Sequence, residues 1–279
     1  MPAEGGQGLV CVRESLKTYE RQWPQDAAAG GNVLRKTCIV SFVFLRSQMR
    51  HLVPWTLTLA VPIVLFAVTY GLRAPVSPES GAEVAMLFES YVVVTGILNN
   101  LILRWAQIRE SGVLVQVSYM CGARYEPLFA AVLAGAAQTS ASGAIFAIFC
   151  SATGYCSGLD AVLLIGATMW LVALLSCVAV LFLIPRFSIT TISVWGSMLL
   201  LAMWCTAGGF GGGSGMNAIL IVCNPMRYAL QTYAMAYMGT RDMTIPIASI
   251  AALVLGALLY LVIGGIAARF VNSRMLPTQ

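Results

Sequence analysis

Long apolar stretches, each about as long as a membrane-crossing helix, alternate with short polar segments along the chain. A bilayer core of about 30 Å needs roughly 20 apolar residues in helical conformation. Six stretches meet this requirement: Val53–Leu72, Val84–Leu103, Pro127–Phe149, Ala161–Ile184, Ile189–Ala207 and Ile245–Ala268. Only the second contains an acidic residue, Glu89, which lies near one end, where we expect it to reach the headgroups. The pattern predicts an all-α integral membrane protein with six transmembrane helices.

A helical stripe of apolar residues precedes the first predicted span. Its members, spaced three or four apart, are Leu34, Cys38, Phe42, Leu45, Met49 and Leu52. Basic residues, among them Arg35 and Arg46, fall on an adjoining face, as in a helix lying in the membrane interface. We therefore expect a cytoplasmic interfacial helix, which either anchors the topology or docks a partner. Residues 1–31 are predicted to be a flexible cytoplasmic tail, and residues 32–279 one membrane domain.

The segment Arg104–Glu126, between the second and third spans, is too polar to cross a membrane and too long for a tight turn. Its polar positions Arg109, Glu110 and Gln116 alternate with the apolar Val113, Leu114 and Val117. This alternation predicts a short amphipathic helix, with one face in the membrane surface and one face exposed. A solvated connector is the alternative interpretation.

The segment Gly208–Thr244, between the fifth and sixth spans, opens with a glycine-rich run and continues with Ala218–Cys223, an apolar stretch too short to cross. Asn224 followed by Pro225 is a strong signal for the start of a helix, because it places a capping residue before proline at the first helical position. We expect this segment to enter the membrane from the outer side and to return before the last span.

Small residues recur at every fourth position of the third predicted span, at Ala131, Gly135, Thr139, Gly143 and Ala147. Such a ladder lets two helices approach closely. We expect the contact to lie within the chain, and contact with a second copy is the alternative.

Composition and charge support a membrane protein and orient it. The chain is 59% hydrophobic and 10% charged, which excludes an ordinary soluble domain. A net charge of +5 without a polybasic run gives no reason to expect a nucleic-acid partner. With the N-terminus inside, thirteen of the sixteen Lys and Arg residues fall on the cytoplasmic side, so both termini are predicted to be cytoplasmic. We expect a multi-pass protein of a cell membrane, the bacterial inner membrane or a plasma membrane.

The chain lacks the residues for several common chemistries. Neither of its two lysines, Lys17 and Lys36, follows a glycine, so no GxxxxGK[ST] phosphate loop is present. A single histidine, His51, excludes an HExxH zinc site, and no metal site is predicted. We therefore expect a transport protein that is not itself an enzyme. An ion-coupled secondary transporter is the alternative, in which Glu89 is the one intramembrane acid.

One motif favours a protease instead. The run Gly212-Gly213-Ser214-Gly215 resembles the GxSG motif of rhomboid-type intramembrane proteases. Those enzymes pair the serine with a histidine on a later transmembrane helix, because the hydroxyl needs a nearby base. His51 lies far earlier and on the opposite predicted side of the membrane, which makes the protease the weakest alternative.

Two local patterns resemble a known family, the permease subunits of ABC type-2 exporters of the drug-resistance and antibiotic or bacteriocin export type. The stretch Arg109-Glu110-Ser111-Gly112-Val113-Leu114 is similar to the RE-x-G-x-L segment that opens the family's coupling helix. The stretch Asn224-Pro225-Met226-Arg227-Tyr228-Ala229 is similar to its NP-x-x-YA segment. The resemblance covers the chain from about Asn32 to the end. The chain departs from the family where Met120-Cys121-Gly122-Ala123 replaces a proline-rich turn, and in its glycine run.

The resemblance implies an exporter of an amphipathic or lipophilic compound, such as a drug, a peptide or a lipid-linked molecule. It implies two copies of a separate cytoplasmic ATPase subunit, which would bind ATP and Mg, a second permease, identical or paralogous, and surrounding membrane lipids. Coupling to the ATPase would involve Arg109, Glu110, Gly112 and Leu114; the interfacial helix would present Leu34, Phe42, Leu45 and Met49; and the outer re-entrant segment would use Asn224, Pro225 and Tyr228. Six large side chains are available to line a transport path: Phe88, Tyr91, Trp170, Trp195, Met198 and Trp204.

Overall fold

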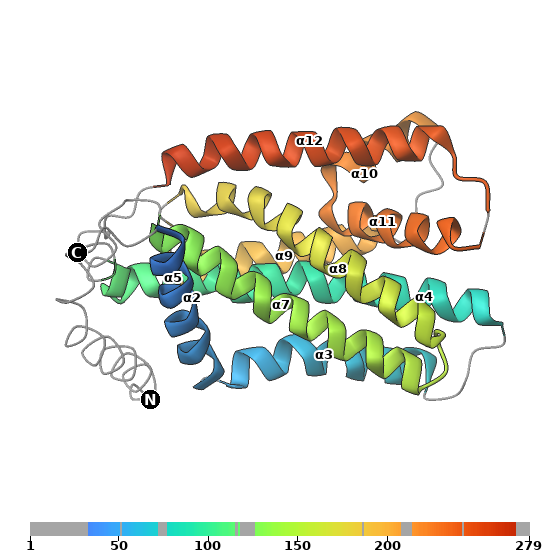
Figure 1. The fold of residues 1–279 in the computed structure, drawn as a ribbon, viewed down its shortest axis with the longest axis horizontal. Helices are drawn as coiled ribbons and strands as arrows, with labels where there is room; N and C mark the ends of the chain where they lie inside the picture. Colours follow the sequence, from blue (N-terminus) through green and yellow to red (C-terminus); the bar gives the residue numbers. More distant parts are fainter. Residues whose placement is uncertain are drawn as a thin grey trace.

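The computed structural model describes residues 33–50, 52–71, 77–114, 117, 126–185, 187–207, 214–241 and 243–271. Regular structure within these residues is helical throughout, with no strand. The long helices lie side by side along the long axis of the molecule (Figure 1). The predicted all-α class is confirmed for this part of the chain.

The bounds of the helices follow the apolar stretches of the sequence closely. In chain order they are α2 (Val33–Arg50), α3 (Leu52–Tyr70), α4 (Pro78–Ile97), the π-helical turn η1 (Leu98–Leu103), α5 (Arg104–Glu110), α7 (Glu126–Ala152), α8 (Gly158–Ala179), the 3₁₀ turn η2 (Val180–Leu183), α9 (Ile189–Ala207), α10 (Ser214–Cys223), α11 (Pro225–Gly239) and α12 (Ile247–Phe270). Segments α4, η1 and α5 form one continuous helix, because η1 inserts a wider turn without breaking the rod.

Five helices in the described ranges are long and apolar enough to cross a membrane. They are Glu79–Glu110, Glu126–Ala152, Gly158–Leu183, Ile189–Ala207 and Ile247–Phe270. The first predicted span corresponds to the 19-residue helix α3, of which the apolar stretch Thr58–Tyr70 is shorter than a span. The chain is therefore a membrane protein by its helices, while a sixth span and the orientation stay predictions.

The outer surface of the bundle is apolar, as a lipid-facing surface must be. Leu201 and Met198 of α9 are 66% and 61% exposed, and Val254 of α12 is 55% exposed. A soluble monomer rarely exposes contiguous apolar patches of such extent, because they would drive association in water. In a bilayer the same side chains meet acyl chains.

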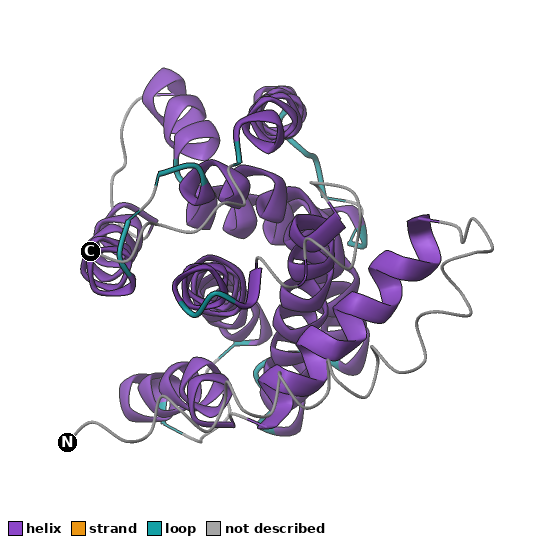
Figure 2. Cartoon of the chain, turned by 90° about the vertical axis from the view of Figure 1, so that its left-hand side faces the viewer, coloured by secondary structure: helices purple, strands orange, loops and turns teal. Residues whose placement is uncertain are grey.

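The continuous helix 79–110 forms the centre of the bundle. Of its most apolar 18-residue stretch, 72% is buried inside the protein, whereas the corresponding share of α9 is 11%. Helices α3, α7, α8 and α11 pack around α4. Helices α2 and α5 lie at one end of the molecule, and α10 and α11 at the other (Figure 1). Figure 2 views the bundle from the end with α2, so that most of the long helices point toward the reader.

The small-residue ladder of α7 packs inside the chain, as predicted. A Cβ at Gly135 would lie 3.1 Å from the carbonyl oxygen of Asn100 in η1. A Cβ at Gly143 would lie only 2.5 Å from a carboxylate oxygen of Glu89 in α4. Between the two glycines, the Asn100 amide donates a hydrogen bond of 3.2 Å to the Thr139 hydroxyl. The ladder therefore brings α7 against the central helix.

An aromatic cluster fastens α3 to this core. The Phe66 ring meets Phe88 of α4 and Phe146 of α7 edge-on, with centroids 5.3 and 5.9 Å apart. Tyr155, in the turn after α7, lies 4.5 Å from Phe66, and its hydroxyl donates to the carbonyl oxygen of Tyr70 at 3.1 Å. Buried aromatic pairs of this geometry stabilise helix contacts beyond the area they bury.

Candidate functional site

The residue pair that carries the resemblance lies at the end of the central helix. Arg109 is buried, with 2% of its surface exposed. One guanidinium nitrogen donates to the carbonyl oxygen of Pro185 at 3.1 Å, and the other donates to that of Phe187 at 2.7 Å. The guanidinium group of an arginine is planar and rigid, so it can donate to two neighbouring carbonyl oxygens at once. Arg109 thereby fixes the end of α5 to the turn between η2 and α9.

Glu110 completes this junction. Its Oε1 accepts a hydrogen bond of 2.8 Å from the backbone N–H of Ile189, the first residue of α9. The first N–H groups of a helix have no hydrogen-bond acceptor inside the helix, and they carry partial positive charge. A carboxylate at this position supplies the acceptor and the opposite charge. We call Arg109, Glu110 and the turn that they hold the α5–α9 clamp; of this turn, 185–189, the structure describes residues 185 and 187–189.

Gly112 ends the central helix. Its φ of 78° lies in the left-handed region, and its N–H donates to the carbonyl oxygen of Arg109 at 3.4 Å. Glycine adopts this conformation at little cost, and a helix commonly ends on such a residue. The φ of Gly112 therefore marks a break in the helix.

The predicted amphipathic helix over Arg104–Glu126 is partly wrong. Residues 104–110 continue the central helix, and Arg109 is buried although the alternation placed it on an exposed face. Leu114 is fully buried, and Val113 and Val117 are nearly so. Periodicity could not reveal that the carbonyl groups of Pro185 and Phe187 would accept hydrogen bonds from Arg109. Residues 115–116 and 118–125, which belong to the later part of this segment, lie outside the described ranges.

Helix α2 lies across the end of α7, and it uses a face that the stripe did not identify (Figure 1). Val40 and Phe44 are its buried apolar residues, whereas Phe42 is 64% exposed. Leu45 is half-buried against the core. The side chains of Leu34 and Met49 lie outside the described part. Two apolar faces exist on this helix, and only packing against α7 decides which one the protein buries.

At the opposite end of the bundle, the Asn224 side chain joins α11 to α9. Its Oδ1 accepts from the backbone N–H groups of Met226 at 2.9 Å and Arg227 at 3.3 Å, which caps α11. Its Nδ2 donates to the carbonyl oxygen of Met203 at 3.1 Å and to the Thr206 hydroxyl at 2.8 Å, both in α9. The predicted helix start at Asn224 is confirmed.

Pro225 occupies the first position of α11, as predicted, and Tyr228 holds this helix to α12. The Tyr228 hydroxyl donates to the carbonyl oxygen of Leu253 at 3.0 Å, and its ring fills the space that Gly256 leaves open. With 10 and 15 residues, α10 and α11 are each too short to cross a membrane. An outer re-entrant path for them stays a prediction, and the glycine run before Ser214 lies outside the described ranges.

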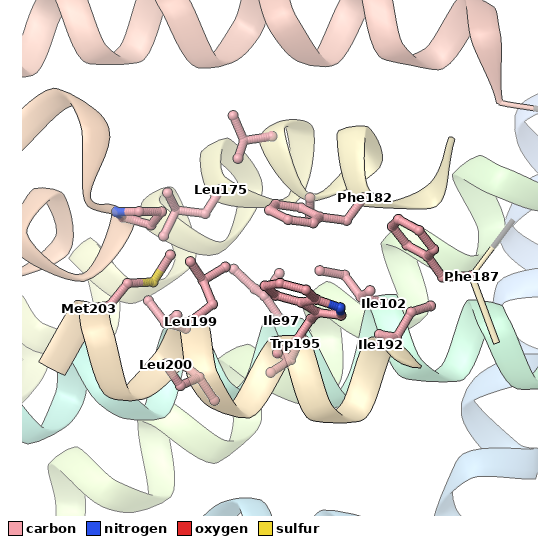
Figure 3. A pocket seen from close by; sticks show the side chains of 16 residues that line it. Ile97, Ile102, Leu175, Phe182, Phe187, Ile192, Trp195, Leu199, Leu200 and Met203 are labelled. Atoms are coloured by element: carbon pink, nitrogen blue, oxygen red, sulfur yellow. The ribbon is translucent and has the colours of Figure 1, made fainter. Parts of the chain in front are cut away.

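An apolar cavity of about 380 Å³ lies between α9 on one side and α8 with η2 on the other (Figure 3). Its walls are Val94, Ile97, Leu98, Ile102, Leu175, Val178, Ala179, Phe182, Phe187, Ile192, Trp195, Gly196, Leu199, Leu200, Met203 and Pro225. Phe187 also supplies a carbonyl to the α5–α9 clamp, so the cavity and the clamp share one wall. Below we call it the α8–α9 cavity.

The structure does not bring the six predicted path residues together. Trp195 alone lines the α8–α9 cavity. Trp204 packs edge-on against Phe88 and Tyr91, at centroid distances of 5.4 and 5.3 Å. Trp170 and Met198 are 58% and 61% exposed on the outside of the bundle. Residue type alone could not separate cavity walls from lipid-facing side chains.

Glu89 does not reach the headgroups, and that prediction is wrong. The residue is fully buried on α4, and its Oε1 accepts a hydrogen bond of 2.8 Å from the Thr168 hydroxyl of α8. Thr168 is in turn 2.7 Å from the hydroxyl of Tyr233 in α11. Sequence reasoning found Glu89 but neither partner, because a lone Thr or Tyr in an apolar helix carries no signal of its own.

Further chemistry is sparse in the described part of the chain. No group of three or more His, Cys, Asp and Glu residues is placed to hold a metal ion there. Ser214 begins α10, while Gly212, Gly213 and His51, the other members of the protease hypothesis, lie outside the described ranges. Comparison of the chain with protein-family models, with curated proteins and with solved structures gives no match.

Proposed function

We propose that this chain is the membrane permease subunit of an ATP-driven ABC exporter that moves an amphipathic or lipophilic compound out of the cell. The observation that carries the proposal is the α5–α9 clamp. It consists of the two residues, Arg109 and Glu110, that resemble the start of the family's coupling helix. Such a clamp would convert a push on the segment after Glu110 into movement of α9.

The proposed transmission begins at the polar end of the central helix. An ATPase subunit docked on the segment after Gly112 would displace α5 together with the 185–189 turn, because three hydrogen bonds join them. Since Phe187 and Ile192 also line the α8–α9 cavity, the same displacement would change the shape of the cavity. Rigid-body movement of packed helices is the ordinary means by which such a signal travels.

The α8–α9 cavity supports the proposed substrate class. Its walls are almost wholly aliphatic and aromatic, and none of the described residues that line it is ionisable. Apolar pockets of this kind select compounds by burial of their hydrophobic surface. An uncharged or amphipathic compound that partitions into the bilayer would enter from the side.

A second permease, identical or paralogous, belongs to the proposal, as do two ATPase copies. The exposure of α9 supports a second permease, since only 11% of the most apolar 18-residue stretch of this helix is buried within the chain. A helix that contributes so little to its own bundle has a large face available for another subunit or for lipid.

The proposal is tested by purifying the tagged chain from its native host in mild detergent, followed by mass spectrometry and an ATPase assay. We expect recovery of a P-loop ATPase. Glu110→Arg should insert normally yet abolish ATP-dependent transport, because it places a cation at the positive end of α9. Glu110→Gln keeps an acceptor oxygen at the same position and serves as the matched control.

Other outcomes identify the alternatives. Recovery of the chain alone, stable and without ATPase activity, would overturn the proposal in favour of an ion-coupled secondary transporter. Cleavage of a membrane substrate that depends on Ser214 would favour the rhomboid-like protease.

A further inference from the structure

A carboxyl group is enclosed where four helices meet. Glu89 of α4 is fully buried between α7, α8 and α11. Its Oε1 accepts from Thr168, and the space beside that oxygen exists because residue 143 of α7 is a glycine. Its Oε2 has no hydrogen-bond partner. A carboxylate with one unsatisfied oxygen is costly inside an apolar bundle.

Nothing among the described neighbours would neutralise a negative charge on Glu89. The titratable groups that face it are Cys150 of α7, Cys156 in the turn before α8, and Tyr233 of α11. None of these is a cation, and no described Lys or Arg pairs with Glu89. The enclosed carboxyl is therefore best satisfied as the neutral acid.

A chain of hydroxyl groups leads away from this carboxyl. The Thr168 hydroxyl donates to Glu89 at 2.8 Å, so it is oriented to accept from the Tyr233 hydroxyl at 2.7 Å. Tyr233 also lines a small crevice of about 10 Å³, together with Cys156, Asp160 and Tyr237. That volume suits about one water molecule.

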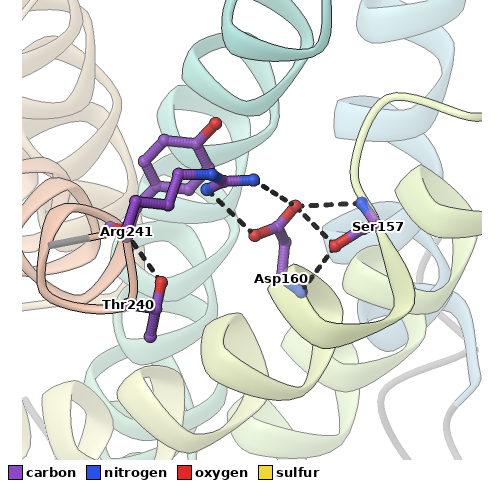
Figure 4. Close-up of polar contacts among 5 residues, drawn as sticks. Ser157, Asp160, Thr240 and Arg241 are labelled. Atoms are coloured by element: carbon purple, nitrogen blue, oxygen red, sulfur yellow. Dashed lines mark hydrogen bonds and ion pairs between the residues drawn. The ribbon is translucent and has the colours of Figure 1, made fainter.

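The crevice is close to the end of the bundle opposite α5, the end predicted to face outward. Asp160, one of its walls, pairs there with Arg241, at 3.3 Å between Nη1 and Oδ1 (Figure 4). The Ser157 hydroxyl donates a hydrogen bond of 2.8 Å to the same carboxylate, and the Arg241 guanidinium lies 3.6 Å from the centre of the Tyr237 ring. Asp160 and Tyr237, with their polar partners, thus line the same crevice as Tyr233, the first residue of the hydroxyl chain.

We propose that Glu89 is a proton-binding site that exchanges protons with the medium at this end through the crevice, Tyr233 and Thr168. On uptake, a hydronium ion in the crevice gives a proton to the Tyr233 oxygen, Tyr233 gives its own to Thr168, and Thr168 gives its own to Glu89 Oε1. The net change is carboxylate plus hydronium to carboxylic acid plus water, and release is the reverse.

Proton binding at Glu89 is linked to the position of α11. Tyr233 reaches Thr168 only while α11 is docked on α8, and docking keeps water from the carboxyl. The docked state therefore holds its proton more tightly than an undocked state does. It follows by linkage that docking is favoured at low pH and weakens as the pH rises. The inference concerns this chain alone and does not depend on an ATPase partner.

Infrared spectroscopy of the full chain in proteoliposomes tests the site. At neutral pH we expect a carboxylic-acid C=O band that is absent in Glu89→Gln. Transfer to D₂O shifts this band as the acid proton exchanges, and Tyr233→Phe should slow that shift by about tenfold or more. Tyr237→Phe is the control, because Tyr237 lines the same crevice and its hydroxyl has no hydrogen-bond partner.

The outcomes are decisive in both directions. Absence of a band that depends on Glu89 would show an ionised carboxyl and overturn the site, and equal exchange in Tyr233→Phe and wild type would overturn the path. The link to α11 is measured by hydrogen exchange of its backbone amides. We expect faster amide opening at high pH, after correction for intrinsic exchange rates, in the wild type but not in Glu89→Gln. An identical pH response in both would overturn the linkage.

Discussion

At the scale of single residues, the α5–α9 clamp depends on acceptor and donor atoms at fixed positions more than on surface charge. Arg109 has two carbonyl acceptors inside the protein, and Glu110 has one N–H donor at the start of α9. An arginine that follows an apolar helix is ordinarily expected to face water. Here the 185–189 turn supplies the polar partners instead, and burial follows.

The Glu110 contact predicts a difference between two small substitutions. Glu110→Ala removes the acceptor of the Ile189 N–H and should lower the free energy of unfolding by about 0.5–1 kcal/mol. Glu110→Gln retains an amide oxygen and should lose less than half of that. Thermal unfolding in detergent measures both variants, and equal losses would show that charge alone matters.

Gly143 predicts a second effect at this scale. A methyl group at this position would lie 2.5 Å from Glu89 Oε1 and 2.7 Å from a Thr168 methyl, so Gly143→Ala should destabilise the fold by about 1–3 kcal/mol. Gly166→Ala in α8 meets no atom within 4 Å and is the matched control. Chemical denaturation of both purified variants compares them, and a Gly143→Ala variant as stable as the control would refute the close contact.

At the scale of elements, the junction of α9 and α11 depends on the oxygen and the nitrogen of the Asn224 side-chain amide. Asn224→Ala removes the α11 cap and the link to α9, with an expected cost of about 1–2 kcal/mol for the cap alone. Asn224→Asp keeps the capping oxygen and loses only the donor to Met203 and Thr206.

Hydrogen exchange of the α11 amides distinguishes the two contributions of Asn224. We expect amide protection to fall in the order wild type, Asn224→Asp, Asn224→Ala. Equal protection in Asn224→Asp and Asn224→Ala would mean that the link to α9, and not the cap, holds α11 in place.

The contact between α8 and α12 predicts different effects for substitutions at two adjacent glycines of α12, Gly264 and Gly265. A Cβ at Gly264 would lie 2.6 Å from the carbonyl oxygen of Cys177, whereas one at Gly265 meets nothing within 4 Å. Gly264→Ala should therefore separate the two helices and lower the melting temperature, while Gly265→Ala should leave it unchanged or raise it. A drop of the same size in both would indicate general helix sensitivity in place of close packing.

At the scale of the whole molecule, the α8–α9 cavity and the clamp make α9 the element that joins the two ends of the bundle. The proposed function predicts that filling the cavity blocks transport without unfolding the protein. Leu199→Trp projects into the cavity and should abolish both ATP-dependent transport and binding of a lipophilic fluorescent probe.

Leu201→Trp is the control for the cavity, because Leu201 is 66% exposed on the same helix and does not line it. Both variants should have wild-type melting temperatures. Undiminished transport in Leu199→Trp would place the transport path elsewhere in the molecule.

The sequence by itself determined the features that depend on local order. The apolar helices occur where stretches of about 20 apolar residues predict them, because backbone groups in lipid must be satisfied within each segment. The start of α11 at Asn224 and Pro225 is equally local, since a cap needs only its neighbours.

Tertiary structure alone decided what surrounds each polar side chain. Glu89 faces Thr168 and Tyr233, which lie 79 and 144 residues later in the chain, and Arg109 faces carbonyl groups 76 and 78 residues later. The buried face of α2 and the walls of the α8–α9 cavity were decided in the same way. A periodic pattern states that a helix has an apolar face, but only the packed bundle determines whether that face meets protein, lipid or a cavity.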